Sequence, residues 1–145
     1  MPLISEISRA WGWAGIAPEE VVAENDFGNV IVRATDGRYW RITPEDGTCV
    51  VIANDRASLE VLLQDQEFLY DWYMRQLVEV ARENLGDLAL ARKYCLKIPG
   101  FLGGEYGWPN LATAPIHEII GMAGDIARQV HELPDGSQVQ LKVVD

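Results

Sequence analysis

Residues 21–53 contain three short apolar runs separated by turn residues. Asp36-Gly37 separates the first two runs, and the segment from Pro44 to Gly47 separates the second from the third. An Asp-Gly pair between alternating apolar runs is a strong signal for a β-hairpin. The pattern therefore predicts an antiparallel meander over residues 21–53, whose expected strands are Asn29–Ala34, Arg38–Ile42 and Thr48–Ala53.

Helical spacing of apolar residues marks two segments in the first two thirds of the chain. Pro2–Trp13 reads as a short amphipathic helix. Residues 57–85 contain neither Gly nor Pro and carry a leucine-rich stripe, which predicts a long helical segment. Asp65 is expected to break this segment by capping a second helix, and Gly86 is expected to end it.

The last segment, residues 116–144, combines a helical stripe with an alternating run. Apolar residues from Ile119 to Val130 recur at helical spacing, and Gln138–Val143 alternates as a terminal strand would. Between the two helical regions, residues 94–110 hold two prolines, four glycines and four aromatics, which predicts an ordered irregular loop. The whole chain, residues 1–145, reads as one α/β (α+β) domain in which helices pack on an antiparallel meander.

The charge of the chain is strongly acidic. Formal net charge is −10 and the isoelectric point is about 4.6. Residues 1–72 hold 13 acids and 5 bases, whereas residues 73–145 hold 9 acids and 7 bases. Such a chain is expected to avoid nucleic acid and anionic membranes and to favour a basic partner, met mainly by the N-terminal half; solubility alone is the alternative reading.

The sequence offers no combination of residues typical of catalysis. His117 and His131 lack further ligands at metal-binding spacing, so no metal is expected. Cys95 and His117 could pair as nucleophile and base, but an apolar setting favours a structural cysteine. The glycines at 100–107 lack the Lys-Ser/Thr pair of a phosphate-binding loop. No catalytic residue and no cofactor is therefore predicted.

The cellular compartment is inferred from the cysteines and from features that the sequence lacks. Cys49 and Cys95 lie in apolar surroundings and favour a reducing compartment. The first ten residues do not resemble a signal peptide, and no apolar stretch is long enough to span a membrane. A cytoplasmic protein is expected.

One surface pattern suggests protein binding. On a continuous helix Glu60, Glu67 and Asp71 would align in an acidic row, with Phe68 and Trp72 beside them. Carboxylates steer a basic partner and aromatics anchor it. The alternative is a solvated helix face with both aromatics packed under a neighbouring element. A break at Asp65 would also disrupt the row.

The order of these features resembles a bacterial family of type VI secretion immunity proteins, which act as antitoxins of secreted DNase effectors. The resemblance covers most of residues 27–136, and Gln66 departs from it where a proline is expected. The motifs that carry it are Gly37-Arg-Tyr-Trp40, Leu62-Leu-Gln-Asp-Gln-Glu-Phe68, Leu85-Gly-Asp-Leu88, Pro99-Gly-Phe-Leu-Gly-Gly104, Asn110 and Leu133-Pro-Asp-Gly136.

The resemblance implies a non-enzymatic protein that binds and neutralises a cognate toxin, a nuclease domain with a basic substrate groove. The candidate contact residues are the acidic row with its aromatics and, in the loop, Glu105, Tyr106 and Trp108. The alternative is a small-ligand binding or regulatory module, in which the loop around Tyr106 and Trp108 closes a pocket.

Overall fold

The computed structural model describes residues 2–134, and the predicted strand Gln138–Val143 lies outside them. The described part has an α+β fold with two antiparallel sheets, as predicted. Its helices are α1 (Leu3–Trp11), α2 (Arg56–Leu62), α3 (Gln66–Tyr73), α4 (Arg75–Leu85) and α5 (Ile116–His131). Its strands are β1 (Pro18–Glu24), β2 (Val30–Ala34), β3 (Tyr39–Thr43), β4 (Thr48–Ala53), β5 (Arg92–Leu96) and β6 (Leu111–Pro115), and short 3₁₀ turns include η2 (Pro44–Asp46) and η3 (Gly100–Leu102).

The larger sheet is the predicted meander with one strand added at its edge. Its order is β1-β2-β3-β4, and each neighbouring pair is antiparallel. The sequence did not mark β1 as a strand because its residues, Pro-Glu-Glu-Val-Val-Ala-Glu, hold three glutamates and do not alternate. At the edge of a sheet such charged residues are tolerated, since one side of the strand pairs with no other strand in residues 2–134.

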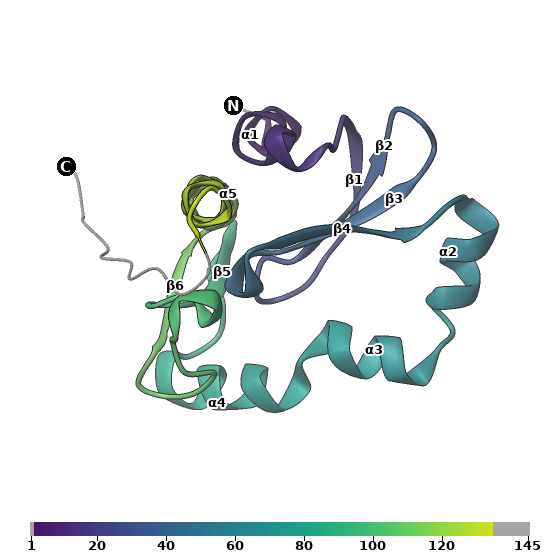
Figure 1. The fold of residues 1–145 in the computed structure, drawn as a ribbon. Helices are drawn as coiled ribbons and strands as arrows, with labels where there is room; N and C mark the ends of the chain where they lie inside the picture. The colour runs from purple at the N-terminus through teal and green to yellow at the C-terminus, as the bar shows by residue number, and fades with distance from the viewer. Residues whose placement is uncertain (1, 135–145) are drawn as a thin grey trace.

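Both faces of this sheet are covered. Side chains alternate across a strand, so Val30 and Val32 of β2 face α1 and α5, whereas Ile31 faces the opposite side. There Ile31 packs with Leu59 of α2 and Trp72 of α3. In Figure 1, α1 and α5 lie on one side of the sheet, and α2, α3 and α4 follow one another as an arc along the other side.

The arc from α2 to α4 is broken twice. The first break is the predicted one, because the Asp65 side chain accepts hydrogen bonds from the backbone N–H groups of Glu67 (2.8 Å) and Phe68 (3.3 Å) and so caps α3. The second break, at Met74, was not predicted. Met74 has φ +49°, a left-handed conformation that is uncommon outside glycine. Gly86 ends α4 as expected.

The second sheet, β5 with β6, corrects the prediction of an irregular loop throughout residues 94–110. Tyr94, Cys95 and Leu96 belong to β5, where Tyr94 pairs with Thr113 and Leu96 with Leu111 of β6. Tyr94 is buried against α4 in an apolar cluster that also contains Phe27. The strand depends on these distant contacts, which a local pattern does not reveal.

The rest of the segment, residues 97–110, is the ordered Gly-rich loop. Asn110 holds it together: its Oδ1 accepts from the backbone N–H of Ile98 (2.9 Å), and its Nδ2 donates to the carbonyls of Ile98 (3.0 Å) and Glu105 (2.8 Å). Gly103 has φ +92°, a left-handed conformation that glycine adopts without steric cost. Gly104 is required for space, because a Cβ there would overlap the Ile98 carbonyl oxygen.

Replacement of Gly104 by valine should lower the free energy of unfolding by more than about 1 kcal/mol, because the added side chain displaces the Ile98 carbonyl that Asn110 binds. The matched control is Gly107→Val in the same loop, where a Cβ meets nothing within 4 Å. Denaturant unfolding measures both variants. Equal midpoints for the two would contradict a steric role for Gly104.

Candidate functional site

An open groove lies between the larger sheet and the α3–α4 arm. It consists of two adjoining hollows of about 410 and 440 Å³ that share Asp71, Met74 and Tyr106 in their walls. The sheet-side hollow is also lined by Arg41, Thr43, Glu45, Asp46, Val50, Ile52 and Phe68. The helix-side hollow is also lined by Tyr70, Arg75, Gln76, Leu77 and Val80.

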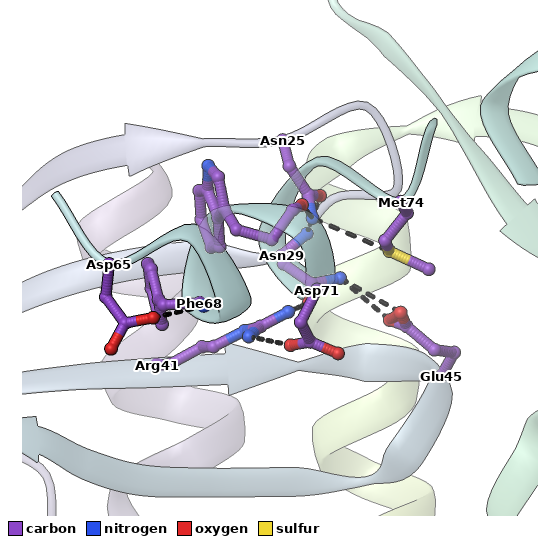
Figure 2. Close-up of polar contacts among 9 residues, drawn as sticks. Asn25, Asn29, Arg41, Glu45, Asp65, Phe68, Asp71 and Met74 are labelled. Carbon is purple, nitrogen blue, oxygen red and sulfur yellow. Dashed lines mark hydrogen bonds and ion pairs between the residues drawn. The ribbon is translucent and has the colours of Figure 1, made fainter. Parts of the chain in front are cut away.

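A completely buried asparagine, Asn29, supports the sheet-side wall. Its Nδ2 donates to the two carboxylate oxygens of Glu45 at 2.8 and 3.1 Å. Its Oδ1 accepts from the guanidinium of Arg41 at 2.8 Å (Figure 2). A buried amide without partners is costly, so these bonds fix the positions of both charged side chains.

A second buried amide, Asn25, joins this wall to the helical arm. Its Oδ1 accepts from the backbone N–H groups of Phe27 (3.0 Å) and Asn29 (2.9 Å), the local arrangement that asparagine favours in turns. Its Nδ2 donates to the carbonyl of Trp72 at 2.8 Å, close to the C-terminal end of α3. Carbonyls at a helix end lack partners within the helix, so this bond stabilises the break at Met74.

Arg41 of β3 connects the sheet to α3. Its guanidinium forms an ion pair with Asp71 at 2.6 Å and lies over the rings of Phe68 and Trp72, at 5.9 and 5.1 Å from their centroids. An arginine in such a position gains from the negative faces of the rings as well as from the carboxylate. Arg41 is therefore held by α3 from two directions.

Glu45 presents a carboxyl group that is almost entirely buried, with 6% of the residue exposed. Burial is the main reason that its pKa rises to about 7. Beside it Asp46 is exposed and accepts a hydrogen bond from the hydroxyl of Tyr106 in the Gly-rich loop. Within residues 2–134 neither Glu45 nor Asp46 forms an ion pair. The sheet-side hollow therefore carries two carboxyl groups that form no ion pair in these residues, although the charge of Arg41 in the same wall acts on Glu45.

Comparison with known families decides the classification. The family described as "T6SS immunity protein Tdi1, C-terminal" matches residues 53–127, about half of the chain. The chain belongs to this type VI secretion immunity family. A search of curated proteins found no match to the chain.

The matched region runs from the end of β4 into α5, so it includes the helical arm and the Gly-rich loop that border the groove of this immunity protein. The sheet-side wall, with Arg41, Glu45 and Asp46, lies before it. The groove therefore joins matched and unmatched parts of the chain.

The structure brings three of the eight predicted contact residues of the immunity protein together, since Phe68, Asp71 and Tyr106 all line the groove. Trp72 does not lie partly outward beside the acidic row but takes the alternative arrangement, because it is 4% exposed and packs against the sheet. Its ring supports Arg41 instead.

The remaining predicted residues lie outside the groove lining. Glu60 pairs with Arg56 on α2, whereas Glu67 is exposed in the first turn of α3, so the cap at Asp65 prevents one continuous acidic row. Glu105 and Trp108 are exposed on the Gly-rich loop, where Lys97 lies over the Trp108 ring. Their role in binding stays a prediction.

Sequence reasoning missed Asn29, Arg41, Glu45 and Tyr70. The asparagines that flank Asp26-Phe-Gly28 were an available turn signal. Nothing local indicates the contacts of the other three residues, because Glu45 and Arg41 reach partners 12 to 30 positions away. Tyr70 resembles any aromatic on a helix until its 67% exposure is known.

Residues 2–134 offer little support for metal, membrane or thiol chemistry. No group of three or more His, Cys, Asp or Glu side chains there could hold a metal ion, and no helix there is long and apolar enough to cross a bilayer. Cys49 and Cys95 are free thiols whose pKa values are raised by burial, that of Cys49 to about 12. A thiol with a raised pKa is a poor nucleophile at neutral pH.

Glu45→Gln should make the immunity protein more stable above pH 7. Because the folded-state pKa of Glu45 is about 7 and its ordinary value is 4.5, the folded state binds the proton more tightly. Tighter proton binding by the folded state adds about 3 kcal/mol at most to the free energy of unfolding. This contribution is fully present below pH 4.5 and is lost as pH rises to about 7. Glutamine can still accept from Asn29 and has no charge to bury.

The measurement is denaturant unfolding at several pH values between 4 and 8. The stability difference between Glu45→Gln and the wild type should grow in favour of the variant up to pH 7 and then level off. Glu105→Gln, which replaces an exposed glutamate, serves as the control. A difference that does not change with pH would contradict the burial of an ionisable Glu45 carboxyl.

Proposed function

We propose that this immunity protein binds one cognate secreted toxin directly, in the cytoplasm of the cell that produces it, and neutralises it without any catalytic activity of its own. Membership of the immunity family is the observation that carries this proposal. An immunity protein acts on a toxin, and a groove with exposed aromatic and acidic residues is a suitable surface for binding one.

The toxin we propose is a nuclease domain. The net charge of −10 supports this choice, because an enzyme that cuts nucleic acid needs a basic surface for its phosphate backbone. Opposite charges accelerate encounter between two proteins. The same charge argues against nucleic acid and anionic membranes as partners of the immunity protein itself.

Co-expression with the toxin encoded beside it should restore growth to cells that the toxin alone arrests. The two proteins should also elute from size exclusion as one stoichiometric complex, and the immunity protein alone should show no hydrolysis of DNA or RNA. Failure of both rescue and complex formation would reject the proposal. An unrelated acidic protein of similar size is co-expressed with the toxin in parallel. If it also restores growth, the rescue reflects negative charge alone and not specific binding.

Acids on the helical arm should speed association with the toxin. The double variant Glu60→Lys/Glu67→Lys reverses two exposed acids and leaves the Asp71–Arg41 pair intact. We expect association to slow by about tenfold at low salt and by less at high salt, where charges are screened. Stopped-flow or surface-based kinetics measures the rate.

The matched control is Glu118→Lys/Glu132→Lys on and beside α5, which makes the same change of net charge elsewhere. Thermal unfolding verifies that both double variants fold, because exposed charges contribute little to stability. Equal slowing by the two would show that only net charge matters, and would remove the acids of the N-terminal half from the binding surface.

A further inference from the structure

The rim of the groove exposes three large apolar or aromatic side chains that come from three separate elements. Tyr70 on α3 is 67% exposed, Val50 on β4 is 51% exposed and Tyr106 in the Gly-rich loop is 48% exposed. All three line the groove. Tyrosines of this kind are the side chains on which protein interfaces most often depend, since they add large contact area at little entropic cost.

The groove has a basic side chain at its helix-side end and, at its sheet-side end, two carboxyl groups that form no ion pair in residues 2–134. Arg75 lines the helix-side hollow, and its guanidinium lies 5.5 Å from the ring of Tyr73. At the sheet side, Arg41 is already paired with Asp71 and bonded to Asn29. The sheet-side carboxyl groups of Glu45 and Asp46 have no base within ion-pair distance in residues 2–134.

We propose that this groove is the surface on which the toxin docks, and that an Arg or Lys side chain of the toxin enters the sheet-side hollow, between Tyr106 and Phe68, to pair with Asp46 and Glu45. This inference rests on the proposed function and adds the contact surface to it. An arginine suits the site best, because its planar group can lie against Tyr106 while it donates to the carboxylates.

The walls are fixed before the toxin arrives. Asn29 holds Glu45 and Arg41, Arg41 holds Asp71, and Tyr106 is hydrogen-bonded to Asp46. A surface that is already ordered loses little conformational entropy on binding. The groove therefore meets the requirement for tight binding that a flexible loop would not meet.

Docking of a cation here would also make binding depend on pH. The groups that face Glu45 are Asn29 just before β2, Arg41 from β3, Asp46 in the same turn and Tyr106 from the loop, and burial makes the Glu45 carboxyl hold its proton up to about pH 7 when no toxin is bound. A bound cation favours the ionised form, so the toxin should bind more tightly as pH rises from 6 to 8.

The test measures the dissociation constant for the toxin domain encoded beside the immunity protein, inactivated at its catalytic site, by titration calorimetry. Tyr70→Ala should raise the constant at least tenfold, and Asp46→Asn, which keeps an acceptor for Tyr106, about fivefold. The matched controls are Met122→Ala, an exposed apolar side chain on α5 outside the groove lining, and Asp87→Asn, an exposed aspartate after α4. Both controls should stay within twofold of the wild type.

Glu45→Gln provides an independent measurement, because it should remove the pH dependence between pH 6 and 8 that the wild type shows. The groove would be rejected, and the proposed function would stand, if the wild type binds the toxin, every groove variant has a dissociation constant within twofold of the wild type, and Glu45→Gln keeps the wild-type pH dependence. An absence of wild-type binding would reject the proposed function, and the groove assignment with it. Tyr70→Ala and Asp46→Asn test the groove separately, so if one variant misfolds, the other still tests the groove assignment.

Discussion

The buried turn from Asn25 to Asn29 is the constraint on which the arrangement of this molecule depends. Asn25 binds the carbonyl of Trp72 in the helical arm, and the carbonyl of Asp26 accepts from the backbone N–H of Tyr94 (2.8 Å) in the second sheet. Asn29 binds the side chains of Arg41 in β3 and of Glu45 in η2. The two asparagine side chains are buried, and a buried polar group without a partner costs about 1–3 kcal/mol. Movement of any one element would therefore break bonds that water cannot replace, and the turn keeps the parts of the fold in one relative position.

The groove is a consequence of using polar contacts to attach part of the helical arm to the sheet. Where Leu59 and Trp72 pack on Ile31, the arm is in close apolar contact and no space is left. Beside this contact, Arg41 spans from the sheet to Asp71 and Phe68 of α3, and the arm breaks at Met74 before α4 reaches the second sheet. An apolar filling would pack more simply, and a buried carboxyl that meets only amide donors lowers stability at neutral pH. Such departures from the most stable choice occur mostly at functional sites.

The elements that the sequence predicts correctly are those with local causes. Asp-Gly turns, the Asp65 cap and the stop at Gly86 each act within a few residues, and the meander and the helical segments follow from them. The missed features have distant causes: β5 forms because β6 is available, and the break at Met74 accompanies the bond that Asn25 makes to Trp72. The same division applies to the candidate site. Residue type and helical spacing are enough to select Asp71 and its neighbours on the helix as candidate contact residues, but only the tertiary structure shows their contacts with the sheet.

Steering and docking on this surface act over different distances, and so affect different stages of binding. The exposed acids act through water over about one Debye length, roughly 8 Å at physiological ionic strength, which is enough to orient a basic toxin before contact. Inside the groove, the Glu45 carboxyl shares a wall with Phe68 and Tyr106 and is largely removed from water, so its attraction is screened less but is felt only once a side chain has entered. Changes to the exposed acids should therefore alter mainly the association rate, whereas changes within the groove should alter mainly the lifetime of the complex. An immunity protein whose toxin is a nuclease, as proposed, needs both, because the toxin must be captured before it acts and must not be released afterwards.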